Sequence, residues 1–482
     1  MKLYESLAQQ YIDDIQSGYL PSGTRLPSLR VLTKQHAVSM TTAIRSYNYL
    51  EAAGWIFSQP QSGFFVSKQI NETNLPLVPK FKGENRDPKE FSPNAGYNSA
   101  SSFFCPLGTA MIAPSLQPKI ALQRTIKRCA SRMGDDMFFY PAIQGEVSLR
   151  RALSDHFRQD HFSFHYSEVV ITNGCIDAIR IALESTTKEG DTVAISSPCF
   201  SGLLDLLAGL SRNIIEISCD DGGLDLEQLE GYMKNKKIAA ALFNTSHMNP
   251  SGTSLSVEQK QRLAQLAEQY CIPIIEDDIY FELAHNSKPP LPVKHWDKSG
   301  YIIWCGSFSK VLAEGLRIGW CLPGRYLDAY LKRQQLTSLG VNHLMQVSMA
   351  EFINTGDYRA HINKMRLTLS YQVHAYRQLF ITYLPANARI SMPDGGLVLW
   401  IQIPSLNACL LEKEARKQQI DIRVGACFST HQYYLDCFRI NCGWPLEHSL
   451  KQEIEKTEKK VSPTEKIMAL CVLINKIILA GI

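Results

Sequence analysis

Lys310 is the residue of this chain whose neighbours best suit covalent chemistry. It follows an apolar run at residues 301–304 and a turn of small residues that contains Ser307 and Ser309, and Arg317 follows it. Hydroxyls and a second cation beside a lysine at a strand end can hold a phosphate, while the lysine amine condenses with an aldehyde. A lone lysine here would usually be a surface charge, so it is the neighbours that indicate a site for a phosphorylated aldehyde.

Carboxylate, phenol and amide groups stand at two other predicted strand ends. Asp277 closes the apolar run 272–276, Tyr280 follows it, and Asn249 lies in a turn after the run 238–243. A buried carboxylate facing a pyridine nitrogen keeps that nitrogen protonated, which makes the ring an electron sink. The side chains of Tyr280 and Asn249 can donate hydrogen bonds to a ring oxygen. Each residue alone is more often a turn or cap residue.

Further positions could complete a ligand site. A predicted strand leads into Asn173, Gly174 and Cys175, which open a helix whose free backbone N–H groups can bind phosphate. Phe200 can stack on an aromatic ring, although a core aromatic is the commoner meaning of such a residue. Arg439 lies inside an apolar strand and needs an anionic partner there, and a carboxylate held by both guanidinium nitrogens is the most specific interpretation.

The elements that must position these residues alternate between apolar runs of strand length and helical patterns. The predicted strands lie at residues 169–171, 192–195, 238–243, 272–275 and 301–304. Strands separated by helices indicate an α/β domain with a mainly parallel sheet. Ligands of such sheets bind at the strand ends, where the residues above are found.

Residues 1–68, called the head below, carry a second and unrelated pattern. Apolar side chains recur at helical spacing in three segments, and two short strand-like runs follow. The predicted order is a helix from Leu3 that ends at Gly18, a helix from Ser28, a helix with Ser39 as its N-cap that ends at Gly54, and wing strands at 56–58 and 64–67. This layout places a recognition helix in the major groove of DNA. Periodicity alone fits a small helical scaffold with a hairpin equally well.

Two other segments complete the expected domain organisation. Residues 69–98 are polar, irregular and rich in proline, which predicts a semi-flexible linker that either lets two heads reach two DNA half-sites or is simple slack. Residues 99–445, called the body, form the ligand-binding domain, and 446–482 form a helical tail. The apolar part of the tail contains Asn475 and Lys476 and is shorter than the ~20 residues that cross a bilayer. A packing or interface helix is therefore favoured over a membrane contact or a wrongly ended reading frame.

Composition narrows the class of protein. The net charge of +4 over 482 residues is small, so any DNA contact must come from a local patch. The 13 cysteines form no CxxC pair and are odd in number, which predicts neither a disulfide framework nor a metal site. The first residues lack the apolar stretch of a signal peptide. We expect a cytoplasmic protein without membrane contact.

The head resembles the GntR family of winged-helix DNA-binding domains. The resemblance lies in Leu3-Tyr4, in the run from Gly23 to Arg30, in Val38-Ser39, in Tyr47 and Leu50, in Gly54 and in residues 62–64. It implies DNA contacts by Arg25, Arg30, Ser39, Thr41, Thr42 and Gly63. Met40 stands where the family usually has a basic residue, which puts operator preference in question, and Arg45, one turn further on, is a candidate substitute.

The body resembles the fold type I, class I aminotransferase group of pyridoxal 5'-phosphate (PLP) enzymes, from about Phe103 to Trp444. By this resemblance Lys310 forms the internal aldimine, Asp277 pairs with the pyridine nitrogen, Tyr280 and Asn249 hold the ring oxygen, and Phe200 stacks on the ring. The implied phosphate contacts come from Asn173, Gly174, Cys175, Ser307, Ser309 and Arg317. Tyr140 matches the tyrosine that reaches the neighbouring subunit's phosphate, and Arg439 the arginine that binds the substrate α-carboxylate.

A GntR-like head joined to an aminotransferase-like body resembles the MocR subfamily of bacterial GntR transcriptional regulators. They imply an α/β protein with an N-terminal winged helix-turn-helix, a large domain with a mainly parallel sheet and a smaller C-terminal domain. We expect a homodimer that binds operator DNA and senses an amine, an amino acid or PLP itself through an aldimine at Lys310. The alternatives are a working aminotransferase acting on an amino acid and a 2-oxo acid, and a repressor that responds to PLP alone.

Overall fold

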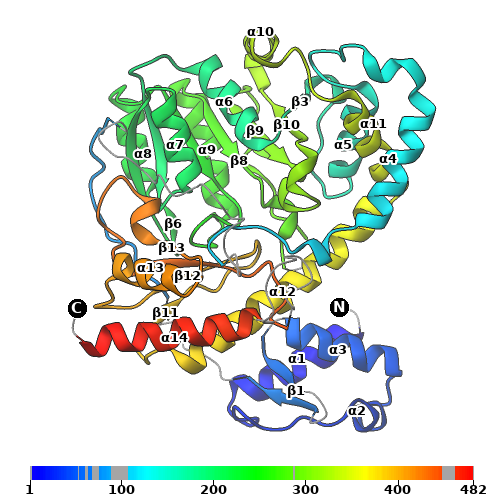
Figure 1. The fold of residues 1–482 in the computed structure, drawn as a ribbon, viewed down its shortest axis with the longest axis vertical. Helices are drawn as coiled ribbons and strands as arrows, with labels where there is room; N and C mark the ends of the chain where they lie inside the picture. Colours follow the sequence, from blue (N-terminus) through cyan, green and yellow to red (C-terminus); the bar gives the residue numbers. More distant parts are fainter. Residues whose placement is uncertain are drawn as a thin grey trace.

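The structure of the protein, a computed structural model, describes residues 3–52, 54–59, 63–67, 75–87, 107–285, 288–447 and 462–480. The head lies at one end of the molecule, beneath the long helix α12, and the body forms the rest (Figure 1). The C-terminal helix α14 runs along the lower side of the body (Figure 1).

The head has the predicted winged-helix order. Its elements are α1 (Leu3–Gln16), α2 (Leu29–Gln35), α3 (Met40–Ala52), β1 (Ile56–Gln59) and β2 (Gly63–Val66), and the two strands pair antiparallel. Side-chain oxygens begin the second and third helices, because Ser28 accepts from the N–H of Val31 and Ser39 from that of Thr42. Tyr47 on α3 is fully buried, and its hydroxyl donates to the Pro27 carbonyl at 2.8 Å. This core fixes α3 relative to the wing.

The body is built on a mainly parallel sheet of eight strands, as predicted. The strands are β3 (Val170–Thr172), β4 (Thr192–Ser197), β5 (Asn213–Asp220), β6 (Gly223–Leu224), β7 (Ala240–Asn244), β8 (Ile274–Asp277), β9 (Ile302–Ser307) and β10 (Gly319–Leu322), in the order β3-β10-β9-β8-β7-β4-β5-β6. Strands β5, β4, β7, β8 and β9 run parallel, while β10 is antiparallel to both of its neighbours.

Helices cover both faces of this sheet (Figure 1). They are α4 (Lys119–Met133), α5 (Val147–Arg158), α6 (Cys175–Thr186), α7 (Ser201–Gly209), α8 (Leu226–Lys234), α9 (Val257–Tyr270), α10 (Leu327–Ser338) and α11 (His343–Asn354). Neighbouring residues of one strand enter different cores: Ile274 packs in the cluster that contains α9, and Ile275 in the cluster that contains α6 and α7. Because both faces are buried, the central strands are continuous apolar runs.

A second, antiparallel sheet forms the smaller part of the body. Its strands are β11 (Arg389–Ile390), β12 (Val398–Gln402), β13 (Arg423–Val424) and β14 (Cys437–Asn441), in the order β11-β12-β14-β13. The helix α13 (Ala408–Lys417) packs here, and α12 (Asp357–Tyr383) joins this part to the large sheet. The smaller α/β part therefore follows the large one along the chain, as expected.

The C-terminal segment packs on the body. Helix α14 (Pro463–Ala480) buries Leu470 and Ile474 in the same core as α12 and α13, and Lys466 donates to the Gln418 carbonyl at 2.7 Å. Among the described residues, no helix has both the length and the apolar character that crossing a membrane requires.

Residues 75–87 differ from the semi-flexible linker that composition predicts for 69–98. The backbone of Arg86 exchanges two hydrogen bonds of 2.9 Å with that of Ile214 at the start of β5, and the Tyr232 hydroxyl donates to the Gly83 carbonyl at 2.6 Å. Further along, the Leu77 N–H donates to Gln402 at 2.8 Å. Backbone pairing with a sheet edge needs no apolar side chains, which is why composition does not reveal it.

Candidate functional site

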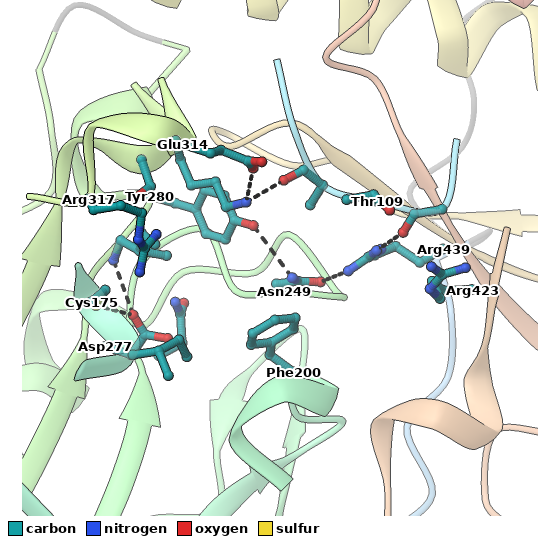
Figure 2. Close-up of a pocket in the computed structure, with 17 residues that line it drawn as sticks. Thr109, Cys175, Phe200, Asn249, Asp277, Tyr280, Glu314, Arg317, Arg423 and Arg439 are labelled. Atoms are coloured by element: carbon teal, nitrogen blue, oxygen red, sulfur yellow. Dashed lines mark hydrogen bonds and ion pairs between the residues drawn. The ribbon is translucent and has the colours of Figure 1, made fainter. Parts of the chain in front are cut away.

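A cavity of about 270 Å³ opens between the carboxyl ends of the parallel strands and the small antiparallel sheet. Figure 2 shows the side chains that line it, which come from both parts of the body. Among the predicted site residues, those that line it are Cys175, Phe200, Asn249, Asp277, Tyr280, Ser309, Lys310, Arg317 and Arg439.

Lys310 lies in a short helical turn directly after β9. Its Nζ donates to the Ala110 carbonyl at 2.6 Å and forms an ion pair with Glu314 Oε1 at 2.7 Å. Ser307 stabilises the turn, because its Oγ accepts from the N–H of Ser309 at 3.1 Å and lies 2.8 Å from the Ser309 Oγ. The amine is thus held at the cavity wall by two oxygen atoms.

Asp277 is a buried carboxylate at the end of β8. The Cys175 thiol donates to its Oδ1 at 3.3 Å, and the N–H of Ile279 donates to the same atom at 3.4 Å. Burial raises the pKa of Asp277 to about 6, against the opposing effects of both hydrogen bonds and of the Lys310 charge. A protonated ring nitrogen in the cavity is the kind of group that would stabilise this carboxylate.

The start of α6 forms a cradle suited to an anion. Gly174, the N-cap, has φ +93°, and a Cβ there would meet Arg317 Nη2 at 2.8 Å. Arg317 Nη2 donates to the Asn173 carbonyl at 2.8 Å, which holds the guanidinium beside the free N–H groups of the helix. A cation and a helix N-terminus at one point suit a phosphate.

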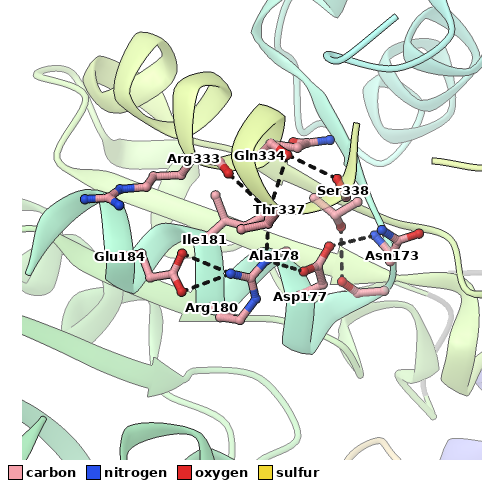
Figure 3. A network of polar contacts seen from close by, with 12 residues as sticks. Asn173, Asp177, Ala178, Arg180, Ile181, Glu184, Arg333, Gln334, Thr337 and Ser338 are labelled. Atoms are coloured by element: carbon pink, nitrogen blue, oxygen red, sulfur yellow. Dashed lines mark hydrogen bonds and ion pairs between the residues drawn. The ribbon is translucent and has the colours of Figure 1, made fainter. Parts of the chain in front are cut away.

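A polar network on the outer side of α6 fixes this cradle (Figure 3). The Asn173 N–H donates to Asp177 at 3.1 Å, and Arg180 donates to Asp177 at 2.8 Å and to Thr337 on α10 at 3.1 Å. Arg180 thus links Asp177 to α10, and Asp177 in turn binds the backbone of Asn173. These contacts fix the turn whose Asn173 carbonyl accepts the hydrogen bond from Arg317.

Arg439 on β14 is buried at the opposite end of the cavity. Its Nη1 donates to Asn249 Oδ1 at 2.8 Å and its Nη2 to the Gly108 carbonyl. The Asn249 amide nitrogen in turn lies 3.5 Å from the Tyr280 hydroxyl. Figure 2 shows the three side chains in a row along one wall.

Some predicted site residues are not among those that line the cavity. Asn173 and Gly174 contact the lining residue Arg317, and Ser307 contacts the lining residue Ser309. The Tyr140 side chain is 84% exposed and lies outside the residues that line this chain's cavity.

Sequence reasoning missed several lining residues. They include Thr109, Ala110, Asn244, Glu314 and Arg423. Ala110 contributes a backbone carbonyl, which leaves no signature in a sequence. Arg423 follows the alternating run Ile420, Asp421, Ile422, and that alternation was the available sign of a strand with one charged face.

The predicted DNA-contacting residues lie on the head, with Arg30 on α2, Arg25 and Gly63 at the wing, and the others at or near the start of α3. Arg25, Arg30, Ser39, Thr41, Arg45 and Gly63 are exposed, and Thr42 is half-buried. Gly63 has φ +106°, and a Cβ there would lie 3.6 Å from the Arg25 Nε, so Arg25 extends along the wing. The hydroxyls of Ser39 and Thr42 lie 2.9 Å apart. Met40, the first residue of α3, is 43% exposed.

Fold and cavity together define a class of protein: a winged-helix DNA-binding head on an aminotransferase-like body. Residues 3–66 match the family of bacterial regulatory proteins of the gntR type, and 113–449 match aminotransferase class I and II. The chain is 31% identical over 464 residues to YdcR, an uncharacterised HTH-type transcriptional regulator of Escherichia coli (strain K12), covering 96% of this chain and 99% of YdcR. YjiR of the same organism, described in the same words, is 30% identical with the same coverage. The chain belongs to the MocR type of GntR-family transcriptional regulators.

Solved structures support the fold of the body. The multiple substrate aminotransferase from Thermococcus profundus matches with a TM-score of 0.70 and 22% identity, over 79% of this chain and 93% of that enzyme. The α-aminoadipate aminotransferase LysN from Thermus thermophilus matches with a TM-score of 0.70 and 20% identity, over 78% of this chain and 92% of that enzyme. The aminotransferase class I and II fold implies PLP as the cofactor.

Proposed function

We propose that this regulator binds PLP at Lys310, senses an amine or amino acid through it, and changes its affinity for operator DNA in response. The observation that carries the proposal is the single cavity in which Lys310, Asp277, Arg317 and Arg439 meet. An amine, a buried carboxylate and two guanidinium groups match the aldehyde, the ring nitrogen, the phosphate and a ligand carboxylate.

The residues around the cavity fit PLP group by group. PLP, when bound, supplies an aldehyde that condenses reversibly with primary amines. Lys310 would hold the aldehyde and Asp277 the ring nitrogen, while Tyr280 and Asn249 would hold the ring oxygen. The phosphate would lie against the start of α6, with Ser307, Ser309 and Arg317, and Phe200 would face the ring.

Glu314 holds the Lys310 Nζ at 2.7 Å. An amine that condenses with an aldehyde needs a free lone pair. The contact of Lys310 with Glu314 would therefore be replaced when PLP is bound to Lys310. Arg439 would orient an amino-acid effector by its α-carboxylate, which aims the effector's own amine toward the Lys310 end.

The DNA half of the proposal rests on the head. Exposed arginines at positions 25, 30 and 45 and the start of α3 offer a cationic surface for phosphates and base edges. A homodimer would place two heads on one operator, and the exposed Tyr140 would reach the partner subunit's phosphate. Effector and operator must then influence each other's affinity by the same factor.

The first test is the visible spectrum of purified protein mixed with PLP, compared with that of Lys310→Ala. We expect an absorption band of lysine-bound PLP in the wild type that the variant lacks, and its absence from the wild type would overturn the proposal. The second test is a gel shift with the DNA upstream of the coding region, with and without amino acids. Steady conversion of an amino acid and a 2-oxo acid, with no shift of that DNA, would instead identify a working aminotransferase.

A further inference from the structure

Two arginines stand side by side at one end of the cavity. Arg423 on β13 and Arg439 on β14 are direct cross-strand partners, and both line the cavity (Figure 2). Like charges in directly opposed positions of a sheet are destabilising. A fold that keeps such a pair around a ligand site is suited to an anionic ligand at that point.

Arg423 lines the cavity and is held by one of its guanidinium nitrogens. Its Nη1 donates to Asp421 Oδ1 and, at 3.1 Å, to the Ile422 carbonyl. Within the described part of the chain, the Arg423 side chain donates its hydrogen bonds from Nη1 alone. Its Nε and Nη2 are therefore left for a ligand in the cavity. The side chain keeps 13% exposure, whereas that of its partner Asp421 keeps 1%.

Asp421 lies behind the cavity wall and orients Arg423 from there. A Cβ at Gly108 would meet the Asp421 carboxylate at 2.7 Å, so this carboxylate lies directly beneath the Gly108 backbone. The Gly108 carbonyl accepts from Arg439, which places Asp421 behind the same wall that Arg439 contacts. Asp421 is therefore a positioning residue.

The roles of the cavity's cations leave Arg423 unassigned. In the proposed function, Lys310 takes the PLP aldehyde, Arg317 the phosphate and Arg439 the α-carboxylate of an amino acid. An amino acid with a neutral side chain uses none of the remaining donors of Arg423. Asp421 offsets the charge of Arg423 through Nη1 alone, so the remaining guanidinium donors are available to a second anionic group in the cavity.

We infer that the effector is an acidic amino acid whose side-chain carboxylate is bound by Arg423. This inference rests on the proposed function, since it assigns Arg439 to the α-carboxylate. It names the ligand class as a dicarboxylic amino acid such as aspartate, glutamate or a longer homologue. Their amides, which have the same shape without the second charge, should bind more weakly.

The experiment compares acids with their amides on the full-length, PLP-loaded protein. L-glutamate is titrated against L-glutamine and L-aspartate against L-asparagine, with the visible absorbance of PLP as readout. At least one acid should reach half-saturation at a concentration roughly tenfold or more below that of its amide, as expected for one hydrogen-bonded ion pair. Arg423→Gln should reduce this ratio to about one by weakening the binding of the acid, whereas Lys417→Gln, a 63% exposed lysine on α13, should leave the ratio unchanged.

Two further variants separate recognition from folding. Arg423→Gln leaves Asp421 buried without its cation, so the double variant Asp421→Asn, Arg423→Gln removes both charges together. It should also lose the preference for the acid while keeping its PLP band and its melting temperature. Arg439→Gln should weaken acid and amide alike.

Each other outcome overturns the inference in an identifiable way. Equal binding of acid and amide by the wild type rejects a dicarboxylic effector while leaving a PLP-based sensor intact. If Arg423→Gln weakens the binding of acid and amide equally, Arg423 helps to hold the α-carboxylate. If it weakens neither, Arg423 only pairs with Asp421 and does not bind the effector. Absence of the PLP band, or of any spectral response to amino acids, overturns the proposed function together with the inference.

Discussion

The imidazole of His374 on α12 lies directly over Gly54, at the end of the head's recognition helix. A Cβ on Gly54 would meet the ring Nδ1 at 2.3 Å, so the approach exists because residue 54 has no side chain. Burial, with the nearby Arg377 charge, lowers the pKa of His374 to about 4, so the ring is neutral at physiological pH. Head and body thus meet through an uncharged, close-packed contact.

Gly54→Ala should detach the head from α12. Gly18 gives a matched control, because it also has φ +78° but has nothing within 4 Å of a Cβ. Both alanine variants bear a similar backbone strain of about 1 kcal/mol, while only the one at position 54 collides with His374. Small-angle X-ray scattering should show a larger radius of gyration for Gly54→Ala than for Gly18→Ala. Adding His374→Ala to Gly54→Ala should restore the smaller radius of gyration. Equal radii for Gly54→Ala and Gly18→Ala would show that Gly54 and His374 do not hold the head against α12.

Asp277→Asn should stabilise the apoprotein and weaken its binding of PLP. A folded-state pKa of about 6, above the ordinary value near 3.9, means that burial disfavours the carboxylate. The contribution of Asp277 to the free energy of unfolding is therefore fully present at pH below about 4 and is lost as the pH rises through 6. The variant should therefore gain about 1–3 kcal/mol at pH 8 and almost nothing at pH 4.

Thermal unfolding of apo wild type and Asp277→Asn at these two pH values measures that gain. PLP titrations followed by absorbance should show an affinity at least roughly tenfold lower in the variant, because the ring nitrogen loses its anionic partner. A variant that is less stable at pH 8 than the wild type would contradict the burial argument.

Arg25→Gln and Arg45→Gln should each flatten the salt dependence of operator binding. A lost phosphate contact lowers the slope of log K against log salt concentration by about 0.9. Fluorescence anisotropy with labelled DNA at several salt concentrations gives the slope. Lys417→Gln, a 63% exposed lysine on α13, serves as the control. A variant that keeps the wild-type slope has lost no phosphate contact.

Gln372→Met should weaken the coupling between effector and operator. Gln372 on α12 donates to the Cys442 carbonyl at 2.7 Å, just beyond the strand that carries Arg439, and lies close in sequence to His374. Methionine has similar length but no donor, and an unsatisfied buried carbonyl costs about 1–3 kcal/mol. The effector-induced change in DNA affinity should fall in this variant and persist in Gln378→Met, on the same helix. An unchanged ratio in Gln372→Met would exclude this route.

Local signals account for what the sequence could predict. Ser28 and Ser39 begin their helices through hydrogen bonds within one turn, so the head's elements could be read in order. The central strands were visible as apolar runs, and the residues after them, such as Asp277 and Lys310, stand at the sheet edge where ligands bind.

Side-chain contacts that periodicity does not specify account for the rest. Glu314 stands four residues after Lys310, a spacing that permits an ion pair without requiring one. Arg423 lies opposite Arg439 only because β13 pairs with β14, which the linear sequence does not show. The same holds for Arg86, whose backbone, not its side chain, pairs with β5.

The docking of residues 75–87 on the body changes the thermodynamics of the head's contact with α12. Covalent geometry lets the chain from Ser67 to Leu75 extend roughly 30 Å at most, which confines the head to a small volume around its anchor. A short tether of this kind gives an effective concentration in the millimolar range. A contact with a dissociation constant near 1 mM, far too weak to hold two separate proteins together, would then be formed for about half of the time. A change of about 1 kcal/mol would shift the ratio of docked to free heads roughly fivefold, to about five sixths or one sixth docked, so only a small free energy is needed to release or recapture the head.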